Sequence, residues 1–139
     1  MEDCVFCKIV EGKIPSVKIF EDGEHVAFLD LYPRVEGQTL VVTKKHFGGY
    51  AFDIPEEAYT KLLAMAKKIG KFLDKALGAE RTVMIIEGYG VDHVHVKLYP
   101  NPPGAYEGYT TTALGPKANE EQLKKIAEKI KKVVVAWKN

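Results

Sequence analysis

Two histidines one residue apart, followed by a lysine, mark a segment that could carry chemistry. It reads His93-Val94-His95-Val96-Lys97-Leu98-Tyr99-Pro100. Successive side chains of a β-strand point to opposite faces, so His93, His95, Lys97 and Tyr99 should share one face while the valine and leucine side chains enter the core. Two imidazoles beside an ammonium can form a metal site, a nucleophile or an anion site. Such a pair also arises by chance, and the rest of the chain must decide.

A second group of reactive side chains lies near the N-terminus, where Cys4 and Cys7 form a Cys-x-x-Cys motif. A redox pair usually follows a strand, and no strand precedes Cys4. A structural disulfide is disfavoured in a reducing cytosol. Tetrahedral zinc accepts two cysteines and two histidines, and His93 and His46 are the candidates for the histidines. His25 begins a strand directly after a turn, and we expect it to be exposed.

Length and composition fit a soluble globular domain spanning residues 1–139. The chain has 139 residues, of which 46% are hydrophobic and 28% charged. Its net charge of +1 gives no overall attraction to nucleic acid or anionic membranes. No apolar run approaches the roughly 20 residues that span a bilayer, and the first residues lack the features of a secretory signal. We therefore expect a cytoplasmic protein that binds neither nucleic acid nor membrane.

Hydrophobic periodicity and turn signals predict an α+β domain with a mostly antiparallel, five-stranded sheet. A short helical turn should span Cys4–Gly12, and a Gly-containing turn should join the first two strands. A Pro/Gly loop is expected over Asn101–Gly108. The predicted strands are Val17–Phe20, His25–Leu31, Gln38–Thr43, Thr82–Glu87 and His93–Pro100.

Two longer helices should pack on this sheet. A central helix is predicted to open near Pro55, with Asp53 or Ile54 near its cap, and to run to about Leu77 before Gly78. Asn119 should cap a C-terminal helix. Apolar residues at helical spacing give each helix one core face. They are Leu62, Leu63, Ala66, Ile69, Phe72, Leu73 and Ala76 in the first helix, and Leu123, Ile126, Ile130, Val133 and Val134 in the second.

With these positions assembled, the chain resembles the histidine triad (HIT) family of nucleotide-binding proteins over nearly its whole length. Four ordered segments carry the resemblance: Cys4-x-x-Cys7-Lys8-Ile9-Val10-x-Gly12-x-Ile14-Pro15, Phe28-Leu29-Asp30-Leu31-Tyr32-Pro33, Gly37-Gln38-Thr39-Leu40-Val41-Val42-Thr43-Lys44-Lys45-His46 and His93-Val94-His95-Val96-Lys97. The resemblance implies a HIT-like fold, a nucleotide or nucleotide-conjugate substrate, and a homodimer.

The resemblance also assigns roles. His95 would be the nucleophile that attacks the α-phosphorus of a nucleotide, and Asp30 would accept hydrogen bonds from the ribose hydroxyls. Phe28 and Leu31 flank Asp30 and would either face a base or belong to the plain core. In cysteine-bearing members and the related galactose-1-phosphate uridylyltransferases, zinc is bound through the positions that match Cys4, Cys7, His46 and His93. This implies a structural zinc here.

The sequence departs from the family pattern in two places. Lys97 stands where the third histidine is expected. It could donate to a phosphate oxygen or a leaving group, but it cannot readily shuttle protons near pH 7 unless burial lowers its pKa. The segment from Glu87 to Asp92 lacks the Asn and Ser or Thr that often contact phosphate. Gly88 and Gly90 could offer backbone N–H groups instead, or could form an ordinary hairpin turn.

Three functions remain open at this point. The first is a nucleotidyl hydrolase or transferase with a covalent nucleotidyl-histidine intermediate on His95. Its substrates would be phosphoramidates, dinucleoside polyphosphates or nucleotide sugars. A backbone carbonyl near His93 should then hold the other ring nitrogen of His95 as N–H. The second is a nucleotide-binding module with little turnover because of Lys97. The third is a metal-dependent hydrolase, although four protein ligands would leave no water site on the metal.

Overall fold

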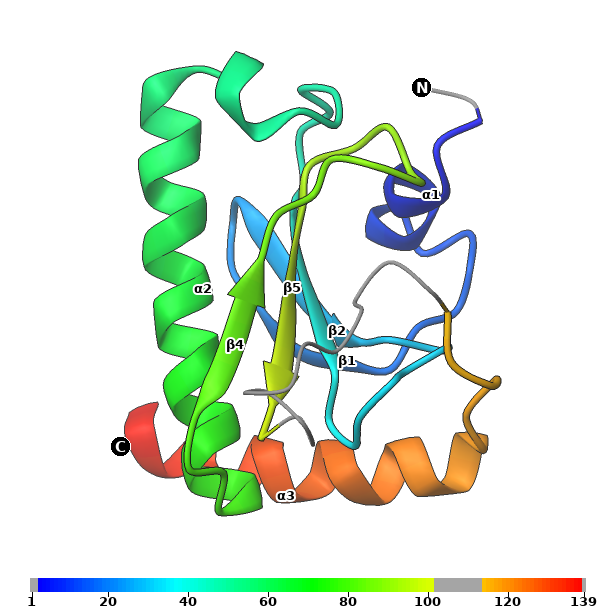
Figure 1. Cartoon of the computed structure of the whole chain (residues 1–139), viewed down its shortest axis with the longest axis vertical. Helices are drawn as coiled ribbons and strands as arrows, with labels where there is room; N and C mark the ends of the chain where they lie inside the picture. Colours follow the sequence, from blue (N-terminus) through cyan, green and yellow to red (C-terminus); the bar gives the residue numbers. More distant parts are fainter. Residues whose placement is uncertain (1–2, 102–113, 139) are drawn as a thin grey trace, which may run out of the picture.

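The computed structural model describes residues 3–101 and 114–138. Five antiparallel strands form one sheet in the order β1-β2-β3-β5-β4, with helices on both of its faces (Figure 1). The strands are β1 (Lys18–Glu21), β2 (His25–Leu29), β3 (Thr39–Thr43), β4 (Thr82–Ile85) and β5 (His95–Pro100). The helices are α1 (Val5–Val10), the 3₁₀ turn η1 (Ala51–Asp53), α2 (Glu56–Leu77) and α3 (Glu120–Lys138). This is the predicted α+β architecture.

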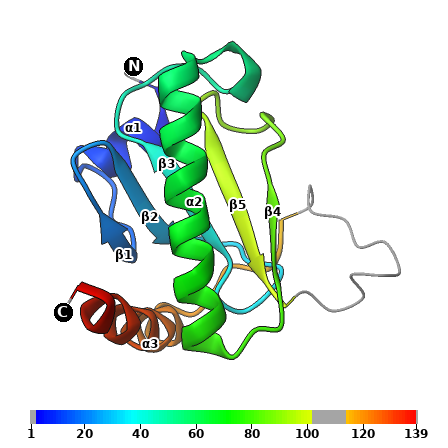
Figure 2. The same ribbon diagram turned by 90° about the vertical axis from the view of Figure 1, so that its left-hand side faces the viewer.

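The two long helices cover one face of the sheet and enclose the main core. Helix α2 lies in front of the strands in Figure 2, and α3 runs across the end of the sheet against α2 and β1. Val94, Val96 and Leu98 point into this core, which confirms the alternation predicted around the two histidines. Among the described residues, no helix is long and apolar enough to cross a membrane.

The short helix α1 packs on the opposite face and forms a second, smaller core. Phe6, Cys7 and Ile9 from α1 meet Val26 and Phe28 from β2, together with residues of β3. Because both faces of β2 and β3 are covered, every residue of these two strands is buried. The second core lies beside the predicted site residues, so α1 forms part of the structure around the site.

The helix ends follow the local sequence signals, with one correction. Helix α2 ends at Gly78, whose φ of 62° is left-handed and suits a residue without Cβ. The side chain of Asn119 accepts hydrogen bonds from the first backbone N–H groups of α3, as predicted. The cap of α2 is Pro55, with no side-chain hydrogen bond, rather than Asp53 or Ile54. Asp53 instead ends the 3₁₀ turn η1, which precedes α2.

The strands predicted at Thr82–Glu87 and His93–Pro100 were each too long. β4 ends at Ile85 and β5 begins at His95, because Gly88 and Gly90 take left-handed φ values of 79° and 85° and turn the chain off the ladder. Other strand bounds shift by one or two residues. His25 was expected to be exposed and is buried, since its ring contacts the Asp22 carboxylate of the preceding turn. The loop predicted over Asn101–Gly108 lies outside the described residues from position 102 onward.

Candidate functional site

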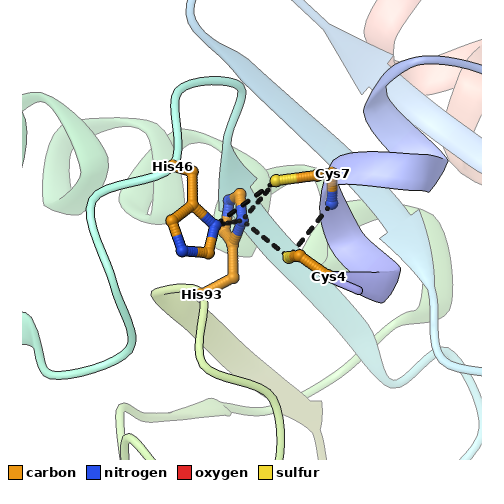
Figure 3. A group of neighbouring side chains, drawn as sticks. All are labelled: Cys4, Cys7, His46 and His93. Atoms are coloured by element: carbon orange, nitrogen blue, oxygen red, sulfur yellow. Dashed lines mark hydrogen bonds between the residues drawn. The ribbon is translucent and has the colours of Figure 1, made fainter. Parts of the chain in front are cut away.

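Four metal-ligating side chains meet between α1 and the sheet (Figure 3). Cys4 caps α1 and Cys7 lies within it, while His46 follows β3 and His93 precedes β5. The distance from Sγ of Cys4 to Nδ1 of His93 is 3.3 Å, and that from Sγ of Cys7 to Nδ1 of His46 is also 3.3 Å. The two Nδ1 atoms lie 3.2 Å apart. The structure therefore brings together all four predicted ligands, with their donor atoms facing one another.

His93 is oriented for this cluster by the backbone of β3. Its Nε2 lies 2.7 Å from the carbonyl oxygen of Thr43, and since a carbonyl can only accept, Nε2 carries the proton. Burial lowers the pKa of His93, more than the Thr43 carbonyl raises it. The neutral ring therefore turns the lone pair of Nδ1 toward the two sulfurs. Burial and the neighbouring Cys4 raise the pKa of the Cys7 thiol, so a bound cation would be needed to favour the thiolate.

A largely apolar pocket of about 430 Å³ opens beside this cluster, on the α1 side of the sheet. Its walls come from α1, the end of β2, β3, β5 and the segment after β4. Six of the predicted site residues line it: Phe28, Asp30, Leu31, Gly90, His95 and Lys97. Gly88, which was also predicted, packs close to the backbone of Gly49 and Tyr50 instead.

His95 presents one ring nitrogen to this pocket. Its Nδ1 lies 2.7 Å from the carbonyl oxygen of His93, so Nδ1 carries the proton and Nε2 is left with its lone pair. Burial lowers the pKa of His95, the His93 carbonyl raises it, and the nearby Lys97 ammonium lowers it further. The net shift is downward, so the ring is neutral at pH 7. The backbone carbonyl at His93 is the acceptor that the sequence predicted.

Asp30 is held in place from two sides. The backbone N–H of Tyr32 donates to Oδ1, and the side-chain amide of Gln38 donates to Oδ2, both at 2.8 Å. The oxygen of that amide accepts in turn from the backbone N–H of Arg34 at 2.6 Å. Each carboxylate oxygen keeps lone pairs for further donors. Gln38 is thus a positioning residue that sequence reasoning did not single out.

The surroundings of Lys97 differ from the expectation. Its ammonium is paired with the carboxylate of Glu87, and both side chains are mostly buried. Glu87 was read as part of a short turn, and no sequence signal ties it to Lys97 except the strand register. Ile85, the last residue of β4, pairs with Lys97. Glu87 follows two residues later, which brings its side chain near Lys97.

The apolar wall contributed by α1 was also missed. Phe6 is buried and contacts Phe28 and His95 edge to face, with ring centroids 5.8 and 5.0 Å apart. Val5 and Ile9 line the pocket beside it. The spacing of Val5, Phe6 and Ile9 on one helical turn is the signal that could have revealed this wall. Phe28 packs in the second core and Leu31 packs against the main core, and both also line the pocket.

Comparison with known proteins places this geometry in a family. A model of the HIT domain matches residues 11–102. The chain is 33% identical over 136 residues to an adenosine 5′-monophosphoramidase of Schizosaccharomyces pombe, covering 91% of this chain and 95% of that protein. A crystal structure of a Hit-like protein from Bartonella henselae has a TM-score of 0.78 and 28% identity over 96% of this chain and 97% of that one.

A zinc-bound histidine triad protein from Mycobacterium smegmatis shares the fold with a TM-score of 0.80, at 24% identity over 99% of this chain and 96% of that one. The family match covers well over half of the chain, and the fold agrees with it. The chain belongs to the HIT domain family.

Proposed function

We propose that this chain is an enzyme, a nucleotidyl hydrolase or transferase that acts at the α-phosphate of a nucleotide conjugate through a covalent intermediate on His95. One observation carries the proposal: His95, whose Nδ1–H is fixed on the His93 carbonyl so that Nε2 keeps its lone pair, lines a 430 Å³ apolar pocket. The similarity to adenosine 5′-monophosphoramidases supports it.

The pocket offers a place for each part of a nucleotide. The apolar wall of Phe6 and Phe28 suits a base, which stacks well against aromatic rings. Asp30 suits the two ribose hydroxyls, since its oxygens can accept from both. This arrangement brings the α-phosphate next to His95. Phosphoramidates, dinucleoside polyphosphates and nucleotide sugars all share these three parts.

In the first chemical step, Nε2 of His95 bonds to the α-phosphorus and the bond to the leaving group breaks. The ring gains positive charge, and its Nδ1–H stays on the His93 carbonyl. In the second step, water or another acceptor attacks the same phosphorus, and the bond between phosphorus and Nε2 breaks. The nucleoside monophosphate unit leaves, and the neutral imidazole is restored.

We propose that zinc is bound by Cys4, Cys7, His46 and His93. Tetrahedral zinc, with bonds of about 2.0–2.1 Å to nitrogen and about 2.3 Å to sulfur, sets its donors about 3.3–3.8 Å apart. Four of the six donor pairs here lie 3.2 to 3.5 Å apart, and all four donor atoms lie within 4.8 Å of one another, so the set suits a tetrahedral ion. Four protein ligands fill the shell, so the ion would tie α1 to the sheet without supplying a water nucleophile.

A nucleotide-binding module with little turnover is the second candidate, and one observation favours it. The Lys97 ammonium is tied to Glu87, which reduces the charge it can offer to a developing phosphate anion.

We further propose, on family resemblance, a cytoplasmic homodimer formed by residues 1–139 as one domain. Light scattering on purified protein tests the dimer.

Rapid quench with α-labelled nucleotide conjugates tests the catalytic proposal. An acid-labile, base-stable adduct should form on His95, as a phosphoramidate bond requires. His95→Ala should lose the adduct and several orders of magnitude in kcat while it keeps nucleotide affinity. If His95→Ala kept more than about a tenth of kcat, a barrier change of only about 1.4 kcal/mol, covalent catalysis by this residue would be rejected.

A further inference from the structure

An acidic residue lies on the pocket wall beside the nucleophile, and the catalytic proposal gives it no role. Glu87 pairs with Lys97, and the two side chains are 10% and 16% exposed. Both residues line the same pocket as His95. The pair is therefore held close to where a nucleotide phosphate must lie, and largely out of water, so solvent screens its charges only weakly.

The charge balance of the pocket decides what can bind there. Among the described residues that line it, Lys97 is the one lysine or arginine, and Asp30 and Glu87 are the two carboxylates. The charged side chains Asp30, Glu87 and Lys97 thus give the wall a formal charge of −1. The sequence holds no other lysine or arginine between Lys97 and Lys117. Within the described part of the wall, phosphate oxygens therefore meet a single cation, whose charge is already matched by Glu87.

We infer that Glu87 is a specificity-determining residue that keeps polyphosphate leaving groups out of this pocket, an inference that rests on the proposed function. A nucleoside monophosphate joined to a neutral or cationic group brings a single negative charge near the pair. A dinucleoside polyphosphate brings several, and each additional charge is repelled by the net negative charge of the wall, to which Glu87 contributes by cancelling the charge of Lys97. A departing amine instead meets the Glu87 carboxylate favourably. The substrate class is thus a conjugate with one phosphate group, such as a phosphoramidate.

Binding to charge variants tests the inference. Dissociation constants for adenosine 5′-phosphoramidate and diadenosine tetraphosphate are measured by calorimetry in magnesium-free buffer, with zinc-loaded protein. All variants also carry His95→Ala, so that neither probe is consumed. The variants are Glu87→Gln, Lys97→Gln and the two combined. Glu128→Gln, which removes an exposed carboxylate on α3, is the matched control.

The quantity compared is the Kd for the tetraphosphate divided by the Kd for the phosphoramidate. Glu87→Gln should lower this ratio about tenfold, the size expected for one unit charge at an intermediate distance and an effective dielectric of about 20. Lys97→Gln should raise it by a similar factor. The double variant keeps the wild-type charge balance and should return to the wild-type ratio, as should Glu128→Gln. If Glu87→Gln fails to fold, the Lys97→Gln and double variants still give the comparison.

A ratio that stays within about twofold across the folded charge variants would overturn the role of Glu87. The proposed function is judged separately, on protein with His95 intact. If the binding ratios follow the charge order but no adduct or turnover appears, covalent catalysis fails while the selectivity stands. If no variant binds either nucleotide, the selectivity inference fails together with the nucleotide pocket.

Discussion

Removing the proposed zinc should destabilise the whole chain, because its four ligands join α1 to the segments that follow β3 and precede β5. Helix α1 has six residues, and a helix of this length is not stable alone. Its hold on the sheet comes from Phe6, Cys7 and Ile9 in the second core and from the donors at Cys4 and Cys7. A bound ion adds a four-point link from α1 to His46 and His93.

The magnitude follows from linkage. Structural zinc sites bind with apparent free energies of at least about 10 kcal/mol, which corresponds to a Kd of about 50 nM. Free zinc at about a thousand times this value stabilises the folded state by about 4 kcal/mol. For a chain of this size each kcal/mol moves Tm by about 3–4 °C. We therefore expect Tm to fall by about 12–16 °C when zinc is removed.

The measurement is differential scanning calorimetry of zinc-loaded and chelator-treated protein, with zinc content determined by elemental analysis. Cys4→Ser should show the lower Tm from the start, and chelator should not lower it much further, which controls for effects of the chelator elsewhere. The reasoning is refuted if purified protein holds less than about 0.2 equivalents of zinc and Cys4→Ser keeps its Tm. A disulfide between Cys4 and Cys7 would refute it equally.

Substitutions at four further positions probe the pocket and the helix ends. Phe6→Ala should lower the free energy of unfolding by about 3–5 kcal/mol and weaken nucleoside binding, while Phe6→Leu should keep most of the stability; urea titration and equilibrium binding measure the two effects. Asp30→Ala should abolish the preference for a ribonucleotide over its 2′,3′-dideoxy analogue, and an unchanged ratio of kcat/KM values would remove Asp30 from the ribose site. Gly78→Ala should lower the free energy of unfolding by about 1 kcal/mol, because the left-handed φ of 62° disfavours a Cβ. Asn119→Ala should lower it by about the same amount, because the cap of α3 is lost. Denaturant midpoints test both.

The parts of the fold that depend on local chemistry could be predicted from the sequence. The alternation around His95 follows from strand geometry and placed Val94 and Val96 in the core. Gly78 and Asn119 marked helix ends because their backbone and side-chain preferences are local. The four metal donors could be proposed because zinc accepts few ligand types and the chain has only two cysteines and four histidines.

Features that depend on contacts between distant segments were missed. The pairing of Glu87 with Lys97 depends on the β4–β5 register and on the turn after Ile85. The sequence did not show that β4 ends at Ile85, ahead of Gly88 and Gly90. The wall formed by Phe6 requires α1 to dock on β2, and the apolar spacing within α1 does not by itself say which strand the helix meets. The burial of His25 came from its contact with Asp22, which a turn signal alone does not reveal.

His93 makes three separate contacts that together link the fold to the reactive nitrogen. Its Nδ1 faces the cysteine sulfurs, its Nε2–H is anchored on Thr43, and its own carbonyl holds the Nδ1–H of His95. A substitution at His93 would therefore disturb the proposed zinc site and the orientation of the His95 ring at once. Of these three contacts, Cys7 and His46 take part only in the one at Nδ1 of His93. In a descendant of this chain, the cysteines could be exchanged for apolar residues without loss of reactivity, provided that the replacement kept the backbone at His93 still.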